Sequence, residues 1–301
     1  MRTVYLGTSG FAASVLRRLA DSPHRPALVV TRPDRPRGRG RRLASPPVAE
    51  VARELGVDLL QPESVNQDDA RARIAAARPE AVCVCAFGAL IKEPLLSDHS
   101  MLNVHPSLLP RWRGAAPVER AIMAGDPETG VSIMRVTAGL DSGPVCLQAA
   151  EPIRPDDTYG SLAPRLERLG GDLLVRALDE SPPCVEQADE AATYADKIGP
   201  DDRTLDPRRP AVELERSVRA LHPHIGARLP LPGDQWLGVH AAARADPAPE
   251  DGPDPGTLAA SDNRLLLGTA DGALELLVVQ PPGGRPMEAA AYLRGHPLST
   301  A

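Results

Sequence analysis

The sequence predicts an α/β protein in which a doubly wound, mostly parallel sheet is followed by a small OB-like β-barrel domain. Strand-like and helix-like segments alternate over the first part of the chain, which is typical of a parallel sheet with helical crossovers. One strand-like segment, residues 81–86, is wholly apolar, as expected of a strand buried on both faces. After residue 207 the pattern changes to short strand-like runs broken by turns.

We expect the first domain to span residues 1–180. Short apolar segments predict its strands, at residues 3–6, 27–31, 58–60 and 81–86. Segments with apolar residues on one face predict its helices, at residues 11–19, 47–55 and 68–77, with a long amphipathic helix after Thr158 that carries Leu162, Leu166, Leu169 and Leu173. In such a sheet, ligands bind beyond the carboxyl ends of the strands.

Residues 181–206 are rich in proline and acidic side chains, and we expect them to form a linker. The second domain, residues 207–301, is expected to begin with a helix and to continue with short strands. The helix has Ala211, Leu214, Val218 and Leu221 on one face, and the strand-like runs are residues 235–239, 264–267 and 273–280. The pattern is consistent with a small barrel of oligonucleotide-binding type, although the pattern alone leaves this open.

Composition is that of a globular protein, with 42% hydrophobic and 25% charged residues. The formal net charge is −6, so any contact with nucleic acid must come from a local basic patch. Cys83 and Cys85 alternate along an apolar strand and are expected to be buried thiols, and neither they nor Cys146 and Cys184 have the spacing of metal ligands. Strand-like sequence starts at Thr3, without a signal peptide before it, and no apolar run reaches membrane-span length, so we expect a reducing cytoplasm.

Three polar residues form the candidate catalytic group. Asn103 and His105 stand two apart at a predicted strand end, so they point the same way, and the later turn with Asp141 can bring a carboxylate beside His105. An amide, an imidazole and a carboxylate together suit acyl-type transfer. Each residue alone is more often structural: an asparagine caps turns, a histidine fills space, and an aspartate before Ser-Gly favours a turn.

The whole string resembles the formyltransferases that use 10-formyltetrahydrofolate. In that family an Asn-x-His pair leads into a Ser-Leu-Leu-Pro loop, here residues 107–110, and an aspartate follows in a Leu-Asp-Ser/Thr-Gly turn, here residues 140–143. Four further stretches are similar to the family members that act on initiator tRNA: residues 31–40, 111–117, 192–197 and 292–296. The similarity therefore runs nearly from end to end.

The resemblance implies a Rossmann-like formyltransferase domain, an OB-like tRNA-binding domain, and transfer of a formyl group from 10-formyltetrahydrofolate to the α-amino group of methionyl initiator tRNA in translation initiation. Asn103 is expected to donate a hydrogen bond to the developing oxyanion, with His105, charged through Asp141, as the second donor. The proton of the attacking amine passes to Asp141 or to a water that it holds; the sequence leaves both open. No metal is needed, and a monomer is expected.

The resemblance also implies two binding regions. The co-substrate is expected to lie against two loops, formed by Ser107, Leu108, Leu109 and Pro110 and by Phe87, Gly88, Ala89 and Leu90. The tRNA is expected to contact Lys197 and an arginine-rich stretch with Arg37, Arg39, Arg41 and Arg42. The alternative, in a protein with a net negative charge, is that this arginine-rich stretch is a solvated loop.

Several alternatives stay open. A formyltransferase for another amine, such as an amino sugar nucleotide, shares the three catalytic residues but needs no arginine loop. A nicotinamide-dependent oxidoreductase would use the turn at residues 7–10, which lacks the third glycine of the dinucleotide pattern. A non-catalytic RNA-binding module would not need Asn103, His105 and Asp141. Residues 222–225, His-Pro-His-Ile, depart from the family's Asn-Pro-Trp-Pro-like string in the second domain.

Overall fold

A computed structural model describes residues 1–37, 42–245, 252–296 and 298. The chain divides into two compact units, each of which is described by itself. The first comprises Met1–Pro117, Glu128–Pro152 and Ala163–Ala195; the second comprises Val118–Pro127, Ile153–Leu162 and Asp196–Ala301.

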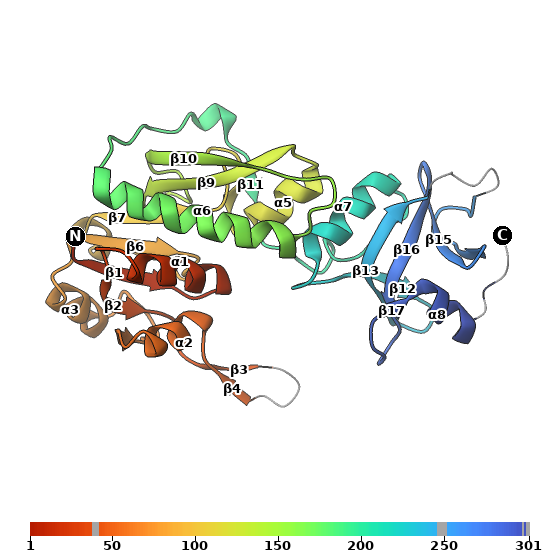
Figure 1. Cartoon of the computed structure of the whole chain (residues 1–301), viewed down its shortest axis with the longest axis horizontal. Helices are drawn as coiled ribbons and strands as arrows, with labels where there is room; N and C mark the ends of the chain where they lie inside the picture. The colour runs from red at the N-terminus through yellow and green to blue at the C-terminus, as the bar shows by residue number, and fades with distance from the viewer. Residues whose placement is uncertain (38–41, 246–251, 297, 299–301) are drawn as a thin grey trace. The chain divides into compact units, whose positions relative to one another are not determined.

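The first unit is built on one seven-stranded sheet, in the order β10-β9-β7-β6-β1-β2-β5 (Figure 1). Five strands run parallel: β1 (Thr3–Gly7), β2 (Pro26–Val30), β5 (Asp58–Leu60), β6 (Ala81–Cys85) and β7 (Met101–His105). The predicted mostly parallel sheet is confirmed. Two antiparallel strands that were not predicted, β9 (Glu128–Arg135) and β10 (Val145–Pro152), extend its edge beside β7.

The helices of the first unit connect and cover these strands. They are α1 (Gly10–Ala20), α2 (Pro47–Glu54), α3 (Asp68–Ala76), the short α4 (Leu95–Asp98) and most of α6 (Tyr159–Glu180). The Ser9 hydroxyl caps α1 by accepting a hydrogen bond from the Ala12 amide at 3.2 Å. Gly170 of α6 lies close to β7, since an added Cβ would lie 2.9 Å from the Val104 side chain. This close contact fixes the strand that leads to the candidate site.

The segment after α6 belongs to the first unit as far as Ala195. Val185 forms an antiparallel bridge with Val145 of β10. A short 3-10 helix, Asp189–Ala191, then leads to β11 (Tyr194–Ala195), which pairs in parallel with β8 (Arg113–Gly114). These residues, which were expected to form a linker, thus make backbone hydrogen bonds to the first unit.

The second unit contains a five-strand antiparallel path, β12-β13-β16-β15-β14, with β17 paired to β16. Its strands are β12 (Ala227–Leu231), β13 (Gln235–Arg244), β14 (Leu258–Ser261), β15 (Arg264–Thr269), β16 (Gly272–Gln280) and β17 (Met287–Glu288). Its helices include α5 (Pro117–Ala124), α7 (Ala211–Leu221) and α8 (Ala289–Gly295). Pro117, the first residue of α5, is assigned to the first unit. The predicted face of α7 is buried against this sheet. Closure of the sheet into an OB-like barrel stays a prediction.

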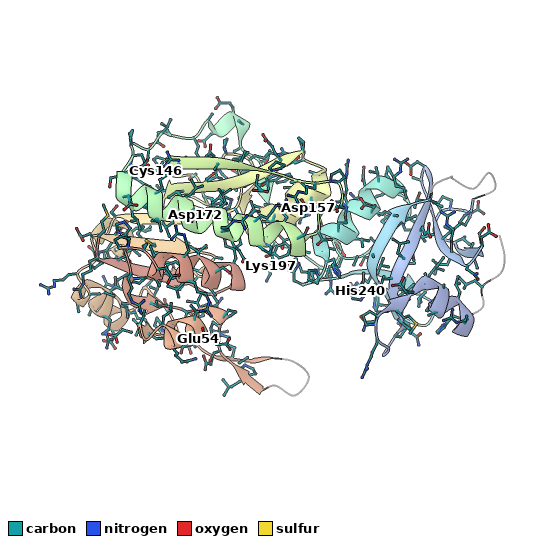
Figure 2. The ribbon with its side chains drawn as sticks, in the orientation of Figure 1. Glu54, Cys146, Asp157, Asp172, Lys197 and His240 are labelled. Carbon is teal, nitrogen blue, oxygen red and sulfur yellow. A yellow bond between two sulfur atoms is a disulfide. The ribbon has the colours of Figure 1, made fainter. Side chains whose placement is uncertain are left out.

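The four cysteines fall into two pairs. Cys83 and Cys85 are free and fully buried in β6, as predicted, and burial raises the pKa of each thiol to about 12. Cys146 on β10 and Cys184 after α6 form a disulfide across 38 residues, which the sequence did not predict (Figure 2). Among the residues that the structure describes, no helix is long and apolar enough to cross a membrane.

Candidate active site

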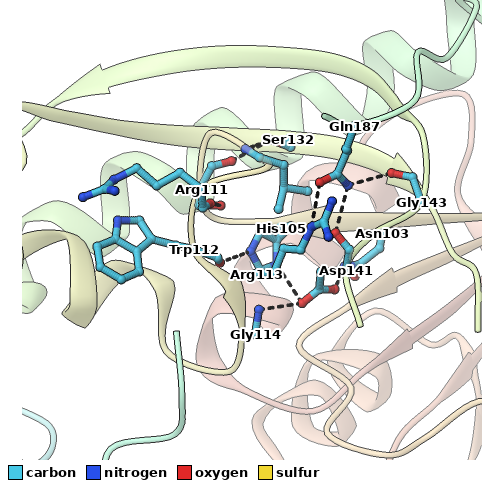
Figure 3. A network of polar contacts seen from close by, with 12 residues as sticks. Asn103, His105, Arg111, Trp112, Arg113, Gly114, Ser132, Asp141, Gly143 and Gln187 are labelled. Atoms are coloured by element: carbon cyan, nitrogen blue, oxygen red, sulfur yellow. Dashed lines mark hydrogen bonds and ion pairs between the residues drawn. The ribbon is translucent and has the colours of Figure 1, made fainter. Parts of the chain in front are cut away.

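The candidate site lies at the carboxyl end of β7, where the strand brings Asn103 and His105 to one edge (Figure 3). On one side of β7, Asn103 lies opposite Val84 of β6. On the other side, His105 lies opposite Ser132 of β9. Asn103 is also paired with Met134 of β9, so it is held on both sides of β7, whereas His105 is held through its pairing with β9. The positions of both residues therefore depend on the sheet.

His105 is almost completely buried and has a polar partner at each ring nitrogen. Its Nε2 lies 2.8 Å from the Trp112 carbonyl oxygen, and its Nδ1 lies 3.5 Å from Oδ2 of Asp141. A carbonyl oxygen can only accept, so Nε2 carries a proton in this arrangement. The other ring nitrogen, Nδ1, faces the Asp141 carboxylate, so each ring nitrogen of His105 has an acceptor beside it.

Asp141 occupies a turn with left-handed backbone, at φ +45°, which is uncommon for a residue other than glycine. Its Oδ2 accepts a hydrogen bond from the Gly114 backbone amide at 3.0 Å, and its Oδ1 accepts a long one, 3.4 Å, from the Asn103 side-chain amide. The structure thus brings Asn103, His105 and Asp141 together. We call these three residues and Gly114 the catalytic corner.

The loop at residues 107–110 is tied to β9 and β10. The Leu109 amide donates to Ser132 Oγ at 3.1 Å, the Ser132 hydroxyl donates to the Ser107 carbonyl at 2.6 Å, and the Gln148 side chain donates to the Leu109 carbonyl at 2.7 Å. Ser107 and Leu109 are buried, whereas Leu108 and Pro110 are half-buried. The loop is rigid at its centre, and Leu108 and Pro110 are its more accessible side chains.

The second expected co-substrate loop follows β6 at the same edge of the sheet. The Phe87 ring is buried in the core, and the Phe87 carbonyl accepts a hydrogen bond from Thr8 Oγ1 at 2.7 Å. Gly88, at φ +71°, and Ala89 are exposed, and Leu90 is 67% exposed. The structure therefore places Gly88 to Leu90 where a ligand could reach them and places the Phe87 side chain in the core.

Two residues beside the catalytic corner were not recognised as candidates. Arg113, which is buried, donates from Nε to the Gln187 side-chain oxygen at 3.0 Å. The Gln187 amide donates to the backbone carbonyls of Asp141 and Gly143 at 2.9 and 2.7 Å (Figure 3). Gln187 lies in the stretch that was expected to be a linker, and no local pattern marks it.

The arginine-rich stretch forms a hairpin in its described part. Strand β3 (Arg35–Arg37) pairs with β4 (Arg42–Ala44) in antiparallel register. We call the paired residues 35–37 and 42–44 the arginine hairpin; Arg39 and Arg41 lie outside the described residues. At its base, Asp34 accepts hydrogen bonds from Gln61 and Ser45, and these bonds lower the pKa of the Asp34 carboxyl group. The carboxylate thus ties the start of the hairpin to its end.

Three further features bear on the alternatives. Lys197 is exposed near the start of the second unit (Figure 2). The turn after β1 is tightly packed, since an added Cβ at Gly7 would lie 2.7 Å from the Tyr5 ring and 2.9 Å from Ala12 Cβ. Within the described ranges, no group of three or more His, Cys, Asp or Glu residues is arranged to hold a metal ion.

Comparison with known families places the chain in a class. Residues 1–178 match the formyl transferase family, and residues 197–297 match the formyl transferase C-terminal domain. Together the two matches cover most of the chain. The chain thus belongs to the formyl transferase class.

The chain belongs to the methionyl-tRNA formyltransferase family. A methionyl-tRNA formyltransferase from Halorhodospira halophila is 44% identical over 306 residues, which cover 99% of this chain and 97% of the relative. Among solved structures, HypX from Aquifex aeolicus has a TM-score of 0.66 at 16% identity and covers 100% of this chain and 49% of HypX. An N-formyltransferase from Helicobacter canadensis, in complex with folinic acid and dTDP-3-aminofucose, has a TM-score of 0.65 at 13% identity and covers 92% of this chain and 98% of that protein.

Proposed function

We propose that this protein transfers the formyl group of 10-formyltetrahydrofolate to the α-amino group of methionine on initiator tRNA, in the cytoplasm, for translation initiation. The observation that carries the proposal is the catalytic corner, in which an amide, an imidazole and a carboxylate converge at one edge of the sheet. It occurs in a chain that is 44% identical to a methionyl-tRNA formyltransferase over 99% of its length.

The amine must be neutral when it attacks the formyl carbon. An α-amino group titrates near about pH 8, and lower when its carboxyl group is esterified, so a neutral fraction is available at physiological pH. The Asp141 carboxylate, whose side chain is 18% exposed, is the base in the corner, and it accepts the amine proton directly or through a water. Its bonds to Gly114 and Asn103 hold it beside the reacting group.

As the amine attacks, a new C–N bond forms and the formyl oxygen gains negative charge. Collapse of this tetrahedral species breaks the bond from the formyl carbon to folate N10, and tetrahydrofolate leaves with the proton that the amine gave up. Asn103 has a donor for this oxygen, because its amide makes only a long 3.4 Å bond to Asp141. His105 is the second donor, through Nδ1, since Nε2 is engaged by the Trp112 carbonyl. Removing one donor of this kind typically costs about 3–4 kcal/mol of transition-state stabilisation.

The co-substrate supplies a formyl carbon already activated by the folate nitrogen, so no metal is required. We propose that it lies against two loops at this edge, formed by residues 87–90 and 107–110. The exposed apolar side chain of Leu90 and the half-buried Leu108 and Pro110 fit an aromatic ligand. Leu140, which precedes Asp141 and is 63% exposed, offers a further apolar contact.

For the tRNA, we propose contacts from Arg37, Arg39, Arg41 and Arg42 of the arginine-rich stretch and from Lys197. Guanidinium groups pair with phosphate oxygens in bidentate geometry. Because the chain has a net negative charge, it needs a local basic segment to bind a polyanion. We further propose that the antiparallel sheet of the second unit closes into an OB-like barrel that binds the tRNA body. We expect the protein to act as a monomer.

The test is a transfer assay with labelled 10-formyltetrahydrofolate and three acceptors: methionyl initiator tRNA, methionyl elongator tRNA and an amino sugar nucleotide. We expect transfer to the initiator tRNA at a rate well above that to either other acceptor, and loss of that transfer in His105→Ala. Transfer to the sugar alone would replace this function with the alternative, a formyltransferase for an amino sugar nucleotide. The observation that favours this alternative is the similarity in fold to the N-formyltransferase complexed with dTDP-3-aminofucose.

A further inference from the structure

Gln187 contacts the turn of Asp141 from outside the catalytic corner. Its side-chain Nε2 donates two hydrogen bonds, to the Asp141 carbonyl at 2.9 Å and to the Gly143 carbonyl at 2.7 Å. One amide group therefore binds the backbone on both sides of Ser142. Gln187 reaches these atoms from a segment more than 40 residues further along the chain.

Arg113 fixes the direction in which the Gln187 amide points. The guanidinium group can only donate, so the Gln187 oxygen must face it, and the Gln187 nitrogen must face the two carbonyls. Arg113 is 3% exposed, and a second nitrogen of its guanidinium donates to Asp189 at 2.8 Å. The chain Arg113–Gln187–Asp141 is thus directional, since each hydrogen bond in it runs from Arg113 to Gln187 or from Gln187 to the Asp141 turn.

The Asp141 turn needs such support because its backbone is strained. Asp141 adopts a left-handed conformation, at φ +45°, in which the Cβ of an L residue comes close to the following carbonyl oxygen. Gly143 fixes the far end of the turn, where an added Cβ would lie 2.0 Å from the Arg135 carbonyl. The two hydrogen bonds from Gln187 hold the backbone carbonyls of this turn. They thereby fix the backbone from which the Asp141 side chain extends.

We infer that Gln187 is a positioning residue for the transfer reaction: by binding the Asp141 and Gly143 carbonyls, it holds the Asp141 carboxylate against His105 and the Gly114 amide. This inference rests on the proposed function, because it assigns Gln187 a role in that reaction. Small displacements of a catalytic group can lower a rate strongly, so a side chain that does not touch substrate can still control kcat.

The segment that carries Gln187 is attached independently of its side chain. Val185 pairs with Val145, Cys184 is bonded to Cys146, and β11 pairs with β8. Substitution of Gln187 therefore leaves the segment in place, and its effect can be separated from unfolding.

The experiment compares Gln187→Ala and Gln187→Glu with wild type in the transfer assay, with kcat and KM measured separately. The glutamate variant keeps an acceptor for Arg113 but loses both donors to the turn. We expect both variants to lower kcat about 10-fold or more, with KM for folate and tRNA within about twofold of wild type. Glu186→Ala is the matched control: it changes an exposed neighbour on the same segment and should leave kcat within about twofold.

A double-mutant cycle with Asp141→Asn separates positioning from a general structural role. If Gln187 acts through the Asp141 carboxylate, Gln187→Ala should cause little further loss in the Asp141→Asn background. The same fold-loss in both backgrounds, or an unchanged kcat in Gln187→Ala, would overturn the inference. Wild-type protein that transfers formyl groups to none of the acceptors would instead contradict the proposed function, so the two failures are distinguishable.

Discussion

The catalytic corner and the arginine hairpin belong to the same unit but are held in opposite ways. In the corner, Asn103 and His105 stand on a paired strand, and the Asp141 carboxylate has three polar neighbours within 3.5 Å. In the hairpin, Leu43 is 73% exposed, and Arg35 makes one exposed ion pair, 3.6 Å from Glu63. The corner is fixed by hydrogen bonds around the buried His105, whereas the described part of the hairpin exposes Arg35 and Leu43 to solvent.

Under the proposed function, the chemistry belongs to the corner and tRNA recognition belongs to the hairpin. Fixed donors in a buried site are worth several kcal/mol each, because they need no reorganisation when charge develops. Exposed arginines are worth less individually, but their contributions to phosphate binding accumulate and depend on salt. We therefore expect few residues with large effects on kcat in the corner and several residues with smaller effects on tRNA affinity in the hairpin.

The largest effects are expected from the corner itself. Asn103→Ala, His105→Ala and Asp141→Asn should each lower kcat by about 10²-fold or more, because each removes a group that stabilises charge or accepts a proton in the transition state. Steady-state kinetics and circular dichroism on each variant test this. Near-wild-type turnover in a folded variant would remove that residue from the mechanism.

Gly114→Ala tests whether the backbone of the corner matters as much as its side chains. Gly114 has φ +123°, and an added Cβ would lie 2.7 Å from the Ala195 carbonyl, so the substitution should shift the amide that binds Asp141. We expect kcat to fall about 10-fold, with some loss of thermal stability. Ala115→Gly, at the exposed next position, is the control and should leave kcat nearly unchanged. A fall in melting temperature without a change in kcat would show that the Gly114 amide is dispensable.

The arginine hairpin should show the opposite behaviour. Replacing Arg37, Arg39, Arg41 and Arg42 with alanine should weaken tRNA binding and reduce its salt dependence by roughly one slope unit for each phosphate that the protein no longer neutralises. Binding titrations with initiator tRNA at several salt concentrations measure this, and a thermal shift with a folate analogue serves as the control. If the salt dependence of tRNA binding were unaltered in this variant, the hairpin would be only a solvated surface that does not contact the tRNA.

Folate binding should depend on neither tRNA nor metal. A folate analogue at 100 times its Kd stabilises the folded state by about 2.7 kcal/mol through mass action, so the melting temperature should rise by several degrees with chelator present and RNA absent. The quadruple arginine variant should show the same rise. Activity lost on chelation and restored by zinc would contradict this prediction.

The smallest signal comes from the strand beside the corner. Cys83 and Cys85 have a pKa raised to about 12 by burial, so at pH 8 only about one thiol in 10⁴ is ionised, and that fraction grows tenfold for each unit of pH. The native protein should therefore resist alkylation at these positions at pH 8, as measured by mass spectrometry. Rapid alkylation would show that β6 opens and that the corner rests on a mobile sheet.

Local patterns predicted the parallel strands and the Asn103–His105 edge, because buried strands are short apolar runs and alternate residues share a side. The same patterns did not predict β9 and β10, which lie outside the strand–helix alternation. They could not identify Gln187 either. Its partners lie 44, 46 and 74 residues away along the chain, and the surrounding Pro- and acid-rich sequence indicates a linker. Contacts of this kind follow from the tertiary fold and leave no mark in local sequence.

The most direct test of the proposed division between catalysis in the corner and tRNA binding in the hairpin is a single-turnover assay of formyl transfer. The assay is run at saturating methionyl initiator tRNA and folate, side by side for His105→Ala and the quadruple arginine variant. Saturation removes differences in binding, so the assay reports the chemical step. We expect the His105→Ala rate to fall by about 10²-fold and the quadruple-variant rate to stay within a few-fold of wild type. A wild-type rate in His105→Ala, or equal losses in both variants, would contradict the account.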